Sequence, residues 1–140
     1  MKAPIKIFIS NSTFSKYSRK PLSILKRAGY QPILNPHGRR LTPEEVRFCL
    51  VGAVGMIAAT ERLDDHVFAS VPTLRVISRV GTGLDSVDLK AAERHGIQVF
   101  RTAEAPVEAV AELTLALILN VLRHVSTADR GVRRPDDLGQ

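Results

Sequence analysis

The chain has 140 residues, of which 44% are hydrophobic and 24% charged, and its formal net charge is +6. This length suits one domain with a buried core and is too short for two ordinary domains. The single cysteine, Cys49, excludes an internal disulfide and a cysteine metal cluster, so no metal site is expected. We expect Cys49 to be a buried small apolar residue and not a nucleophile.

Positive charge is concentrated in the N-terminal part. Residues 1–47 hold ten Lys and Arg against two Glu, or +8, and the remaining residues hold ten against twelve acids, or −2. Such a basic half suits an anionic small molecule or a nucleic acid, and a plain solvated surface is the simpler alternative. Nucleic acid is disfavoured, because the basic residues at 16–27 match no recognised module and include Tyr17 as the only aromatic residue.

Strands and helices are predicted to alternate along residues 5–100. In chain order we predict a strand at 5–9, a helix at 21–28, a strand at 32–34, a helix from Pro43 capped by Thr42 and Glu45, a strand at 54–58, a helix at 64–70, a strand at 74–78, a helix between Asp88 and Gly96, and a strand at 97–100. Short parallel strands joined by crossover helices form a doubly wound, flavodoxin-like α/β sheet, here of about five strands. Ligands bind such sheets outside the carboxyl ends of the strands, which selects residues 10–13, 58–62 and 80–83.

A long apolar C-terminal helix is predicted at residues 106–123. Its Val, Leu and Ile residues lie on all sides, so it requires cover on all sides. The sheet of so small a domain covers one side, and another domain or chain must cover the other. The run at 113–122 is too short for the roughly twenty residues that span a bilayer, and residues 1–11 lack a signal-peptide pattern. We expect a soluble cytoplasmic protein with no membrane partner, ending in a polar, frayed tail at 126–140.

The sequence RVGTGLDS, residues 79–86, lies between a predicted strand and a predicted helix, as a dinucleotide-binding loop does. Gly81 and Gly83 fit the first two glycines of that fingerprint. Ser86 stands at the third position, and the Asp85 carboxylate would repel a pyrophosphate at the helix N-terminus. On these residues alone the match to a dinucleotide loop is weak.

A wider set of segments resembles one enzyme family. Residues 74–89, 91–92, 95–97 and 108–115, with 35–42 in addition, are similar to the D-isomer-specific 2-hydroxyacid dehydrogenases, particularly their D-3-phosphoglycerate dehydrogenase branch. The resemblance extends through about Arg133. It implies a substrate-binding domain at 1–104, an interdomain or dimerisation helix at 105–125, and NAD held by a separate nucleotide-binding domain that these 140 residues lack.

The resemblance also implies site residues. The loop at 79–86 would line the cleft between the two domains, with Thr60 and the amides of Val80 and Gly81 at the substrate carboxylate and Thr82 near the nicotinamide end of the cofactor. Alternatively, Thr82 is a turn residue whose hydroxyl bonds locally. Asp85 is expected to cap the following helix.

The catalytic groups of the family are expected to lie outside this sequence. An Arg for the substrate carboxylate, a His paired with an acid, and the pyrophosphate loop would all follow residue 140, so we expect no catalytic residue here and no NAD binding by this chain alone. We expect the four histidines to be structural or solvated; they are His37, His66, His95 and His124.

Two departures from the family pattern leave the substrate open. Residues 101–103, Arg-Thr-Ala, replace an Asn and a Pro, and residues 58–62 lack an Arg-Ser pair. Arg39, Arg40 or Arg62 could supply charge for a phosphate. We expect a domain that binds an anionic 2-hydroxy acid, with D-3-phosphoglycerate as the first guess, and that is inactive alone. The alternatives are an oligomerisation or regulatory module that forms a homodimer or binds a partner chain through 106–123, and half of a split dehydrogenase.

Overall fold

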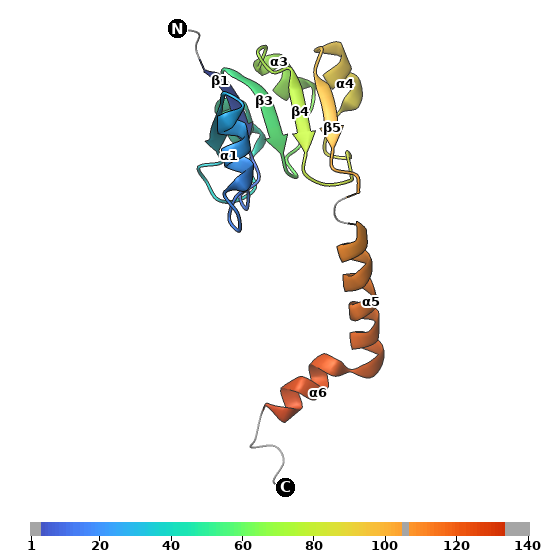
Figure 1. Cartoon of the computed structure of the whole chain (residues 1–140). Helices are drawn as coiled ribbons and strands as arrows, with labels where there is room; N and C mark the ends of the chain where they lie inside the picture. The colour runs from blue at the N-terminus through green and yellow to red at the C-terminus, as the bar shows by residue number, and fades with distance from the viewer. Residues whose placement is uncertain (1–3, 105–106, 134–140) are drawn as a thin grey trace. The chain divides into compact units, whose positions relative to one another are not determined.

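The computed structural model describes residues 4–104 and 107–133, and the chain divides into two compact units, Met1–Ala103 and Glu104–Gln140. The elements of the first unit are β1 (Ile5–Ile9), α1 (Lys20–Arg27), β2 (Tyr30–Leu34), α2 (Pro43–Cys49), β3 (Ala53–Ala58), α3 (Asp65–Ser70), β4 (Val76–Arg79), α4 (Leu89–Arg94) and β5 (Gln98–Arg101). The second unit contains α5 (Val107–Arg123) and α6 (Val125–Val132). Figure 1 shows these elements in chain order.

The strands form one parallel sheet in the order β2-β1-β3-β4-β5. This order confirms the predicted doubly wound α/β fold. The chain moves outward in one direction from β1 to β2 and then in the other direction through β3, β4 and β5. The strand order therefore reverses between β1 and β3, and the carboxyl ends of these two strands are where ligands of such sheets bind.

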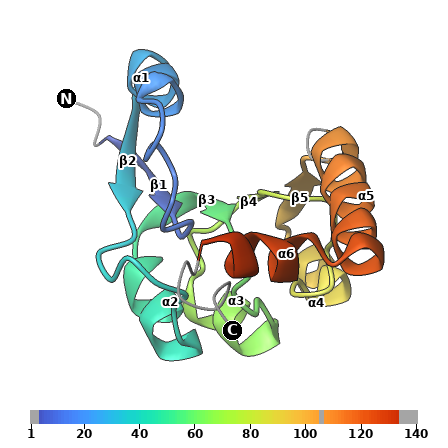
Figure 2. The ribbon, with the colours of Figure 1, turned by 90° about the horizontal axis from the view of Figure 1, so that it is seen from below.

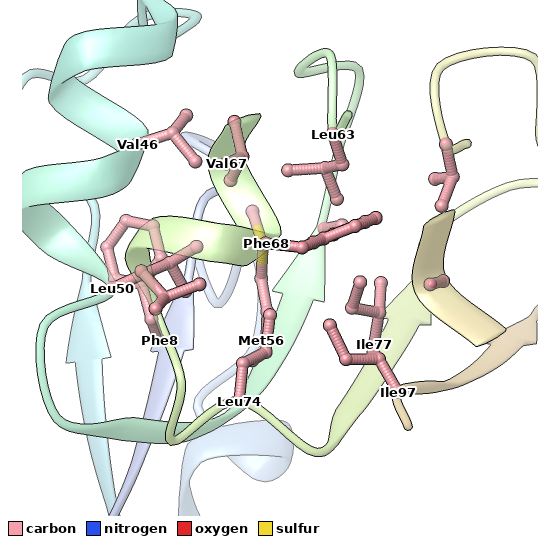
Figure 3. Close-up of a cluster of buried hydrophobic side chains, with 14 of the residues drawn as sticks. Phe8, Val46, Leu50, Met56, Leu63, Val67, Phe68, Leu74, Ile77 and Ile97 are labelled. Atoms are coloured by element: carbon pink, nitrogen blue, oxygen red, sulfur yellow. The ribbon is translucent and has the colours of Figure 1, made fainter. Parts of the chain in front are cut away.

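Helices α2, α3 and α4 cover one face of the sheet, where the core forms (Figure 2). Phe8, Met56 and Ile77 point from three adjacent strands toward Leu50 and Phe68 of the α2 and α3 regions, and all five are 0–1% exposed (Figure 3). Full burial of an apolar side chain of this size contributes about 1.5–3 kcal/mol. This face therefore anchors the strands whose carboxyl ends carry the candidate site.

The opposite face of the sheet is covered within this unit by α1, at the β2 end (Figure 2). Gly55 in β3 leaves room on this face, because a Cβ there would come within 2.8 Å of the Ile7 side chain and 3.0 Å of the Val76 side chain. Beside it lies an apolar groove of about 340 Å³, bounded by Leu25 of α1 and Tyr30 of β2.

Polar side chains begin the helices on the covered face. Thr42 caps α2 and forms the predicted capping box with Glu45, whose carboxylate also pairs with Arg39 at 2.6 Å. The expectation that Asp85 caps α4 is wrong: the N-cap is Asp88, whose carboxylate accepts a hydrogen bond from the Ala91 amide at 2.9 Å. The helix begins at Leu89, four residues after Asp85, so the carboxylate of Asp88 is the one within reach of the first-turn amides.

The second unit differs from the polar, frayed tail predicted at 126–140, because α6 occupies 125–132. His124 adopts a left-handed conformation with φ 53° and ends α5. The Asn120 side-chain oxygen then accepts hydrogen bonds from the amide and the hydroxyl of Ser126, which satisfies groups at the start of α6. The predicted start of the long helix at Pro106 and the tail residues 134–140 lie outside the described residues.

Among the described residues, no single helix is long and apolar enough to cross a membrane. Helices α5 and α6 together reach the required length and composition, but they are bent by 65° at the break between them.

The Glu45 ion pair predicts a specific dependence of stability on pH. The hydrogen bond from Arg39, and then that from the Thr42 amide, lower the pKa of Glu45 from 4.5 to about 2. A lowered pKa in the folded state stabilises the fold above pH 4.5, and this stabilisation is lost as the pH falls toward 2. We expect Glu45→Gln to lower the urea midpoint at pH 6, with the difference from the wild type disappearing near pH 2.

Glu44→Gln is the matched control, because it removes the same charge from the same helical turn, where Glu44 forms an ion pair with Arg47 alone among the described residues, at 3.5 Å. Equal effects of the two substitutions at every pH would contradict the role assigned to the Glu45 pair.

Candidate functional site

The start of the RVGTGLDS loop is tied to both neighbouring strands of β4. The Val80 amide donates to the Ala58 carbonyl at 2.8 Å, which extends the β3–β4 pairing by one bond. The Gly81 amide donates to the Thr102 hydroxyl at 2.7 Å, and Arg101 donates to the Thr82 carbonyl at 2.9 Å. Residues 80–82 are therefore held at the carboxyl edge of the sheet, between the ends of β3 and β5.

Gly81 occupies a conformation that side chains rarely adopt, with φ +133°. A Cβ at this position would also meet the Arg79 guanidinium at 2.5 Å. That guanidinium donates to the Val80 carbonyl, and its Nε is buried with no hydrogen-bond partner among the described residues. The glycine therefore keeps a backbone donor close to a positive charge, which favours an anion.

Thr60 lies on the adjacent loop, two residues beyond the end of β3, and its side chain is exposed. The bond between the Val80 amide and the Ala58 carbonyl brings this loop alongside Gly81. The structure thus places Thr60, Val80, Gly81 and Thr82 on neighbouring loops at one edge, with Thr82 exposed to solvent at the turn.

A buried hydrogen-bond network fixes the loop that carries Thr60. Ser10 follows β1 and Glu61 follows Thr60, and these two polar residues are 1% and 2% exposed. The Ser10 hydroxyl donates to Glu61 Oε2 at 2.7 Å and accepts from the Ala59 amide at 2.9 Å, and the Ala59 amide also lies 3.1 Å from the same carboxylate oxygen. This network, which we call the Ser10–Glu61 network, joins the ends of β1 and β3 at the point where the strand order reverses.

Asn35 extends the Ser10–Glu61 network to a third loop. Its side-chain amide donates to the carbonyls of Ser10 and Arg39, each at 2.8 Å, and its side-chain oxygen accepts from the His37 amide at 2.8 Å. The loops after β1, β2 and β3 are therefore linked by side-chain bonds at a common edge. Linked loops hold their donors in place before a ligand arrives, which lowers the cost of binding.

A cavity of about 420 Å³ opens on the helix side of the same edge. Arg40 and Arg62 line it together with three carboxylates, those of Asp64, Asp85 and Asp88. This balance of charge suits an anionic ligand poorly, and none of residues 60 and 80–82 lines the cavity. An anion is therefore better suited to the open loop edge at residues 60 and 80–82 than to this cavity.

The loop at 79–86 does not fit a dinucleotide pyrophosphate. That ligand needs several free amides directly at a helix N-terminus, whereas the Val80 amide is bonded to the backbone of β3 and α4 begins only at Leu89. Ser86 and Asp85 occupy the positions nearest the following helix. The described residues also contain no group of three His, Cys, Asp or Glu side chains placed to hold a metal ion.

Two further titratable residues singled out by the sequence, His95 and Cys49, lie in structural contacts. His95 packs its ring 6.0 Å from that of Phe68 and contacts Asp65 at 3.0 Å; its hydrogen bond, and that from Arg94, lower the pKa of Asp65. Cys49 is half-buried beside the core, and this burial raises the pKa of its thiol, which disfavours the reactive thiolate.

Sequence reasoning selected the segments that contain Ser10 and Glu61 but not these residues themselves. It also missed Thr102 as the partner of the Gly81 amide. The sequence signal that could have identified Ser10, Glu61 and Thr102 is that each lies shortly after a predicted strand. The burial of Glu61 was not readable, because it depends on a hydroxyl 51 residues away in the chain.

The Ser10–Glu61 network predicts the effect of truncating Glu61. We expect Glu61→Ala to lower the free energy of unfolding by about 2 kcal/mol, because buried hydrogen bonds to a charged group are lost. Glu61→Gln retains an acceptor for the Ser10 hydroxyl, so it should lower the free energy of unfolding by less than half as much as Glu61→Ala. Urea denaturation measures both, with exposed Glu93→Ala as the matched control. A Glu61→Ala effect no larger than that of the control would contradict the network.

Comparison with known proteins agrees with this architecture. Residues 10–131 match the family described as D-isomer specific 2-hydroxyacid dehydrogenase, catalytic domain. The glyoxylate reductase of Pyrococcus horikoshii is 39% identical over 74 residues, which are 53% of this chain and 22% of that protein. The D-3-phosphoglycerate dehydrogenase of Mycobacterium leprae is 33% identical over 78 residues, which are 56% of this chain and 15% of that protein.

The crystal structure of a protein from Thermus thermophilus superimposes with a TM-score of 0.85 at 32% sequence identity. The superposition covers 97% of this chain and 42% of that one, so this chain spans well under half the length of these three proteins. Because the family match covers residues 10–131 of 140, the chain belongs to the D-isomer specific 2-hydroxyacid dehydrogenases and corresponds to their catalytic domain.

Proposed function

We propose that residues 1–104 form a substrate-binding domain that holds the carboxylate of a small 2-hydroxy or 2-oxo acid at Gly81. The observation that carries this proposal is the hydrogen bond from the Gly81 amide to the Thr102 hydroxyl. Thr102 is exposed, so an incoming carboxylate can replace its hydroxyl without opening the core. A hydrogen bond to a charged acceptor is about twice as strong as one between neutral groups, which favours the exchange.

The neighbouring groups support an acid at this position. Arg79 contributes positive charge directly beside Gly81. Val80 shapes the loop through its bond to Ala58, and Thr60 offers a hydroxyl from the adjacent loop. The exposed Thr82 faces the position that we assign to the nicotinamide end of a cofactor bound elsewhere.

The substrate class follows from the family and from the charge. Members of the family act on 2-hydroxy and 2-oxo acids. The relatives in Pyrococcus horikoshii and Mycobacterium leprae are named for glyoxylate and for D-3-phosphoglycerate, both small anions. We propose an acid of two or three carbons as the ligand, with D-3-phosphoglycerate as the first choice because the chain carries a net charge of +6.

These 140 residues bind and orient the acid but do not complete the reaction. Family members use NAD(P), which accepts or supplies the hydride. Of the histidines in the first unit, His95 is engaged with Phe68 and His37 lies on the loop after β2, so neither is placed beside Gly81. Proton and hydride transfer would therefore require a nucleotide-binding domain supplied outside this sequence.

A second candidate function, assembly, is favoured by α5. Its apolar side chains are exposed on all sides within the second unit, with Leu122 and Val121 at 68% and 69%. So continuous an apolar surface marks a contact with another protein surface. We propose that α5 is the interdomain or dimerisation helix expected at 105–125, and that the chain forms a homodimer through it.

The acid site predicts a strong effect of Gly81→Ala. Because φ +133° is unfavourable for alanine and the new methyl group meets Arg79, the amide moves and the carboxylate loses its donor. We expect at least a tenfold weaker affinity for glyoxylate and for D-3-phosphoglycerate in isothermal titration. Gly83→Ala is the control in the same loop, because its methyl group meets only the flexible Asp85 side chain, at 3.0 Å.

Thr102→Val tests the role of the Gly81 amide in binding without distorting the loop. It preserves side-chain shape and removes only the hydroxyl that occupies the Gly81 amide, so we expect it to bind the acids a few fold more tightly. Weaker binding by Thr102→Val, or equal losses in Gly81→Ala and Gly83→Ala, would contradict the proposed site.

The assembly proposal predicts a dimer in solution. We expect sedimentation at micromolar concentration to give about twice the chain mass of 15.4 kDa. Leu117→Glu should shift the population to monomers by placing a charge on the apolar surface, whereas Glu112→Gln should not. A wild-type monomer at this concentration would rule out assembly through this helix.

A further inference from the structure

A second polar cavity, of about 550 Å³, lies where the loop after β1 meets α1 and the end of β2. Its lining includes three cationic side chains and three hydroxyls, namely those of Lys16, Arg19, Lys26, Ser12, Ser15 and Ser23. No acidic residue lines it. This composition is opposite to that of the 420 Å³ cavity, where three aspartates face two arginines.

Within the part of the chain that the structure describes, no carboxylate pairs with the cations of this basic cavity. Among the described residues, Lys16, Arg19 and Lys26 form no ion pair, and the sequence contains no Asp or Glu before Glu44. Like charges held around one cavity repel each other. An anion in the cavity would relieve this repulsion and would be attracted by all three side chains.

Ser15 is an independent sign of a ligand. It adopts a left-handed conformation with φ 61°, which is uncommon for a residue other than Gly, Asn or Asp. Its hydroxyl is buried and has no hydrogen-bond partner among the described residues. A strained backbone and an unsatisfied hydroxyl in one residue cost stability, and such costs are concentrated at binding sites.

The start of α1, from which Arg19 and Leu22 line the cavity, adds a positive electrostatic potential to it. The N-cap residue Arg19 makes no side-chain hydrogen bond to the helix, and Pro21 follows within the first turn. The positive end of the helix dipole is therefore not neutralised by an acidic cap, and its first turn contains no acidic residue.

We propose that the basic cavity binds the phosphate group of a small organic phosphate. Phosphate oxygens would accept hydrogen bonds from the Ser15 hydroxyl and from the charged groups of Lys16 and Arg19. Phe14, Leu22 and Leu34 form an apolar wall of the same cavity, which can contact the carbon skeleton of the ligand. The concave shape and the lack of stacking aromatic residues other than Phe14 favour a small molecule over a nucleic acid strand.

This second site is separate from the acid site at Gly81. Strand β3 lies between β1 and β4, so the loops after β1 and β4 begin about 10 Å apart at two strand spacings, and the cavity lies farther out, toward β2. An acid of three carbons with its carboxylate at Gly81 does not reach Ser15. The ligand of the basic cavity is therefore a different molecule from the acid held at Gly81.

Calorimetric titration with pyrophosphate, in buffer without divalent cations, tests the proposal directly. We expect one pyrophosphate per chain, and at least tenfold weaker binding by Lys16→Ala/Arg19→Ala. The control is Lys20→Ala/Arg27→Ala, which removes two charges from α1 outside the cavity lining and should change the affinity less than threefold. Ser15→Gly should weaken binding several fold while raising the thermal midpoint, because glycine tolerates the left-handed backbone.

Three results would overturn the proposal: no binding of pyrophosphate at millimolar concentration, equal losses in the two double variants, or tighter and more salt-dependent binding of a short RNA. The first would show an unoccupied basic surface, the second a general charge effect, and the third a nucleic acid surface. Gly81→Ala should leave pyrophosphate binding unchanged, and pyrophosphate should not compete with glyoxylate, so the failure of either site is distinguishable from that of the other.

Discussion

The hydrogen bond of 2.7 Å between the Ser10 hydroxyl and the Glu61 carboxylate fixes the edge of the sheet on which the candidate site depends. A carboxylate that is 2% exposed is costly to bury unless its oxygens are hydrogen-bonded. The Ser10 hydroxyl and the Ala59 amide both bond the Oε2 oxygen of Glu61, and Asn35 links Ser10 to the next loop. Breaking one bond would leave the other buried polar groups unsatisfied, so the loops after β1, β2 and β3 keep one arrangement.

The proposed acid site combines this fixed edge with one contact that a ligand can replace, the hydrogen bond from the Gly81 amide to the Thr102 hydroxyl. Thr60 is carried by the loop that the Ser10–Glu61 network holds, whereas the Gly81 amide is paired with an exposed hydroxyl. Fixed surroundings keep the entropic cost of binding low, and the replaceable hydroxyl lets a carboxylate enter. The basic cavity at Ser15 lies on the other side of β1 from β3, so the two proposed sites share the sheet but no lining residue.

Periodicity and capping patterns predicted the sheet and most of its helices, because strands of about five residues and the Thr42–Glu45 capping box are local signals. The errors in the predicted element boundaries arose where the start of an element depends on residues that the local pattern does not include. β2 begins at Tyr30, ahead of its predicted start, since it pairs with all of β1, and the expected cap at Asp85 is wrong because α4 begins only after Asp88. Helix α6 was missed, since its first turn depends on the side chain of Asn120. The proposed roles of Thr60, Val80, Gly81 and Thr82 came from family resemblance, and the sequence marked the partners of their loops only by their position just after a strand.

The central claim is that the carboxyl edge around Gly81 holds the acid, and mapping backbone amide chemical shifts during titration with glyoxylate tests it most directly. We expect saturable shifts confined to residues 59–61, 79–83 and 101–102, with no saturable change on addition of NAD. Shifts confined to other residues, or a larger response to NAD than to glyoxylate at the 79–86 loop, would contradict the account.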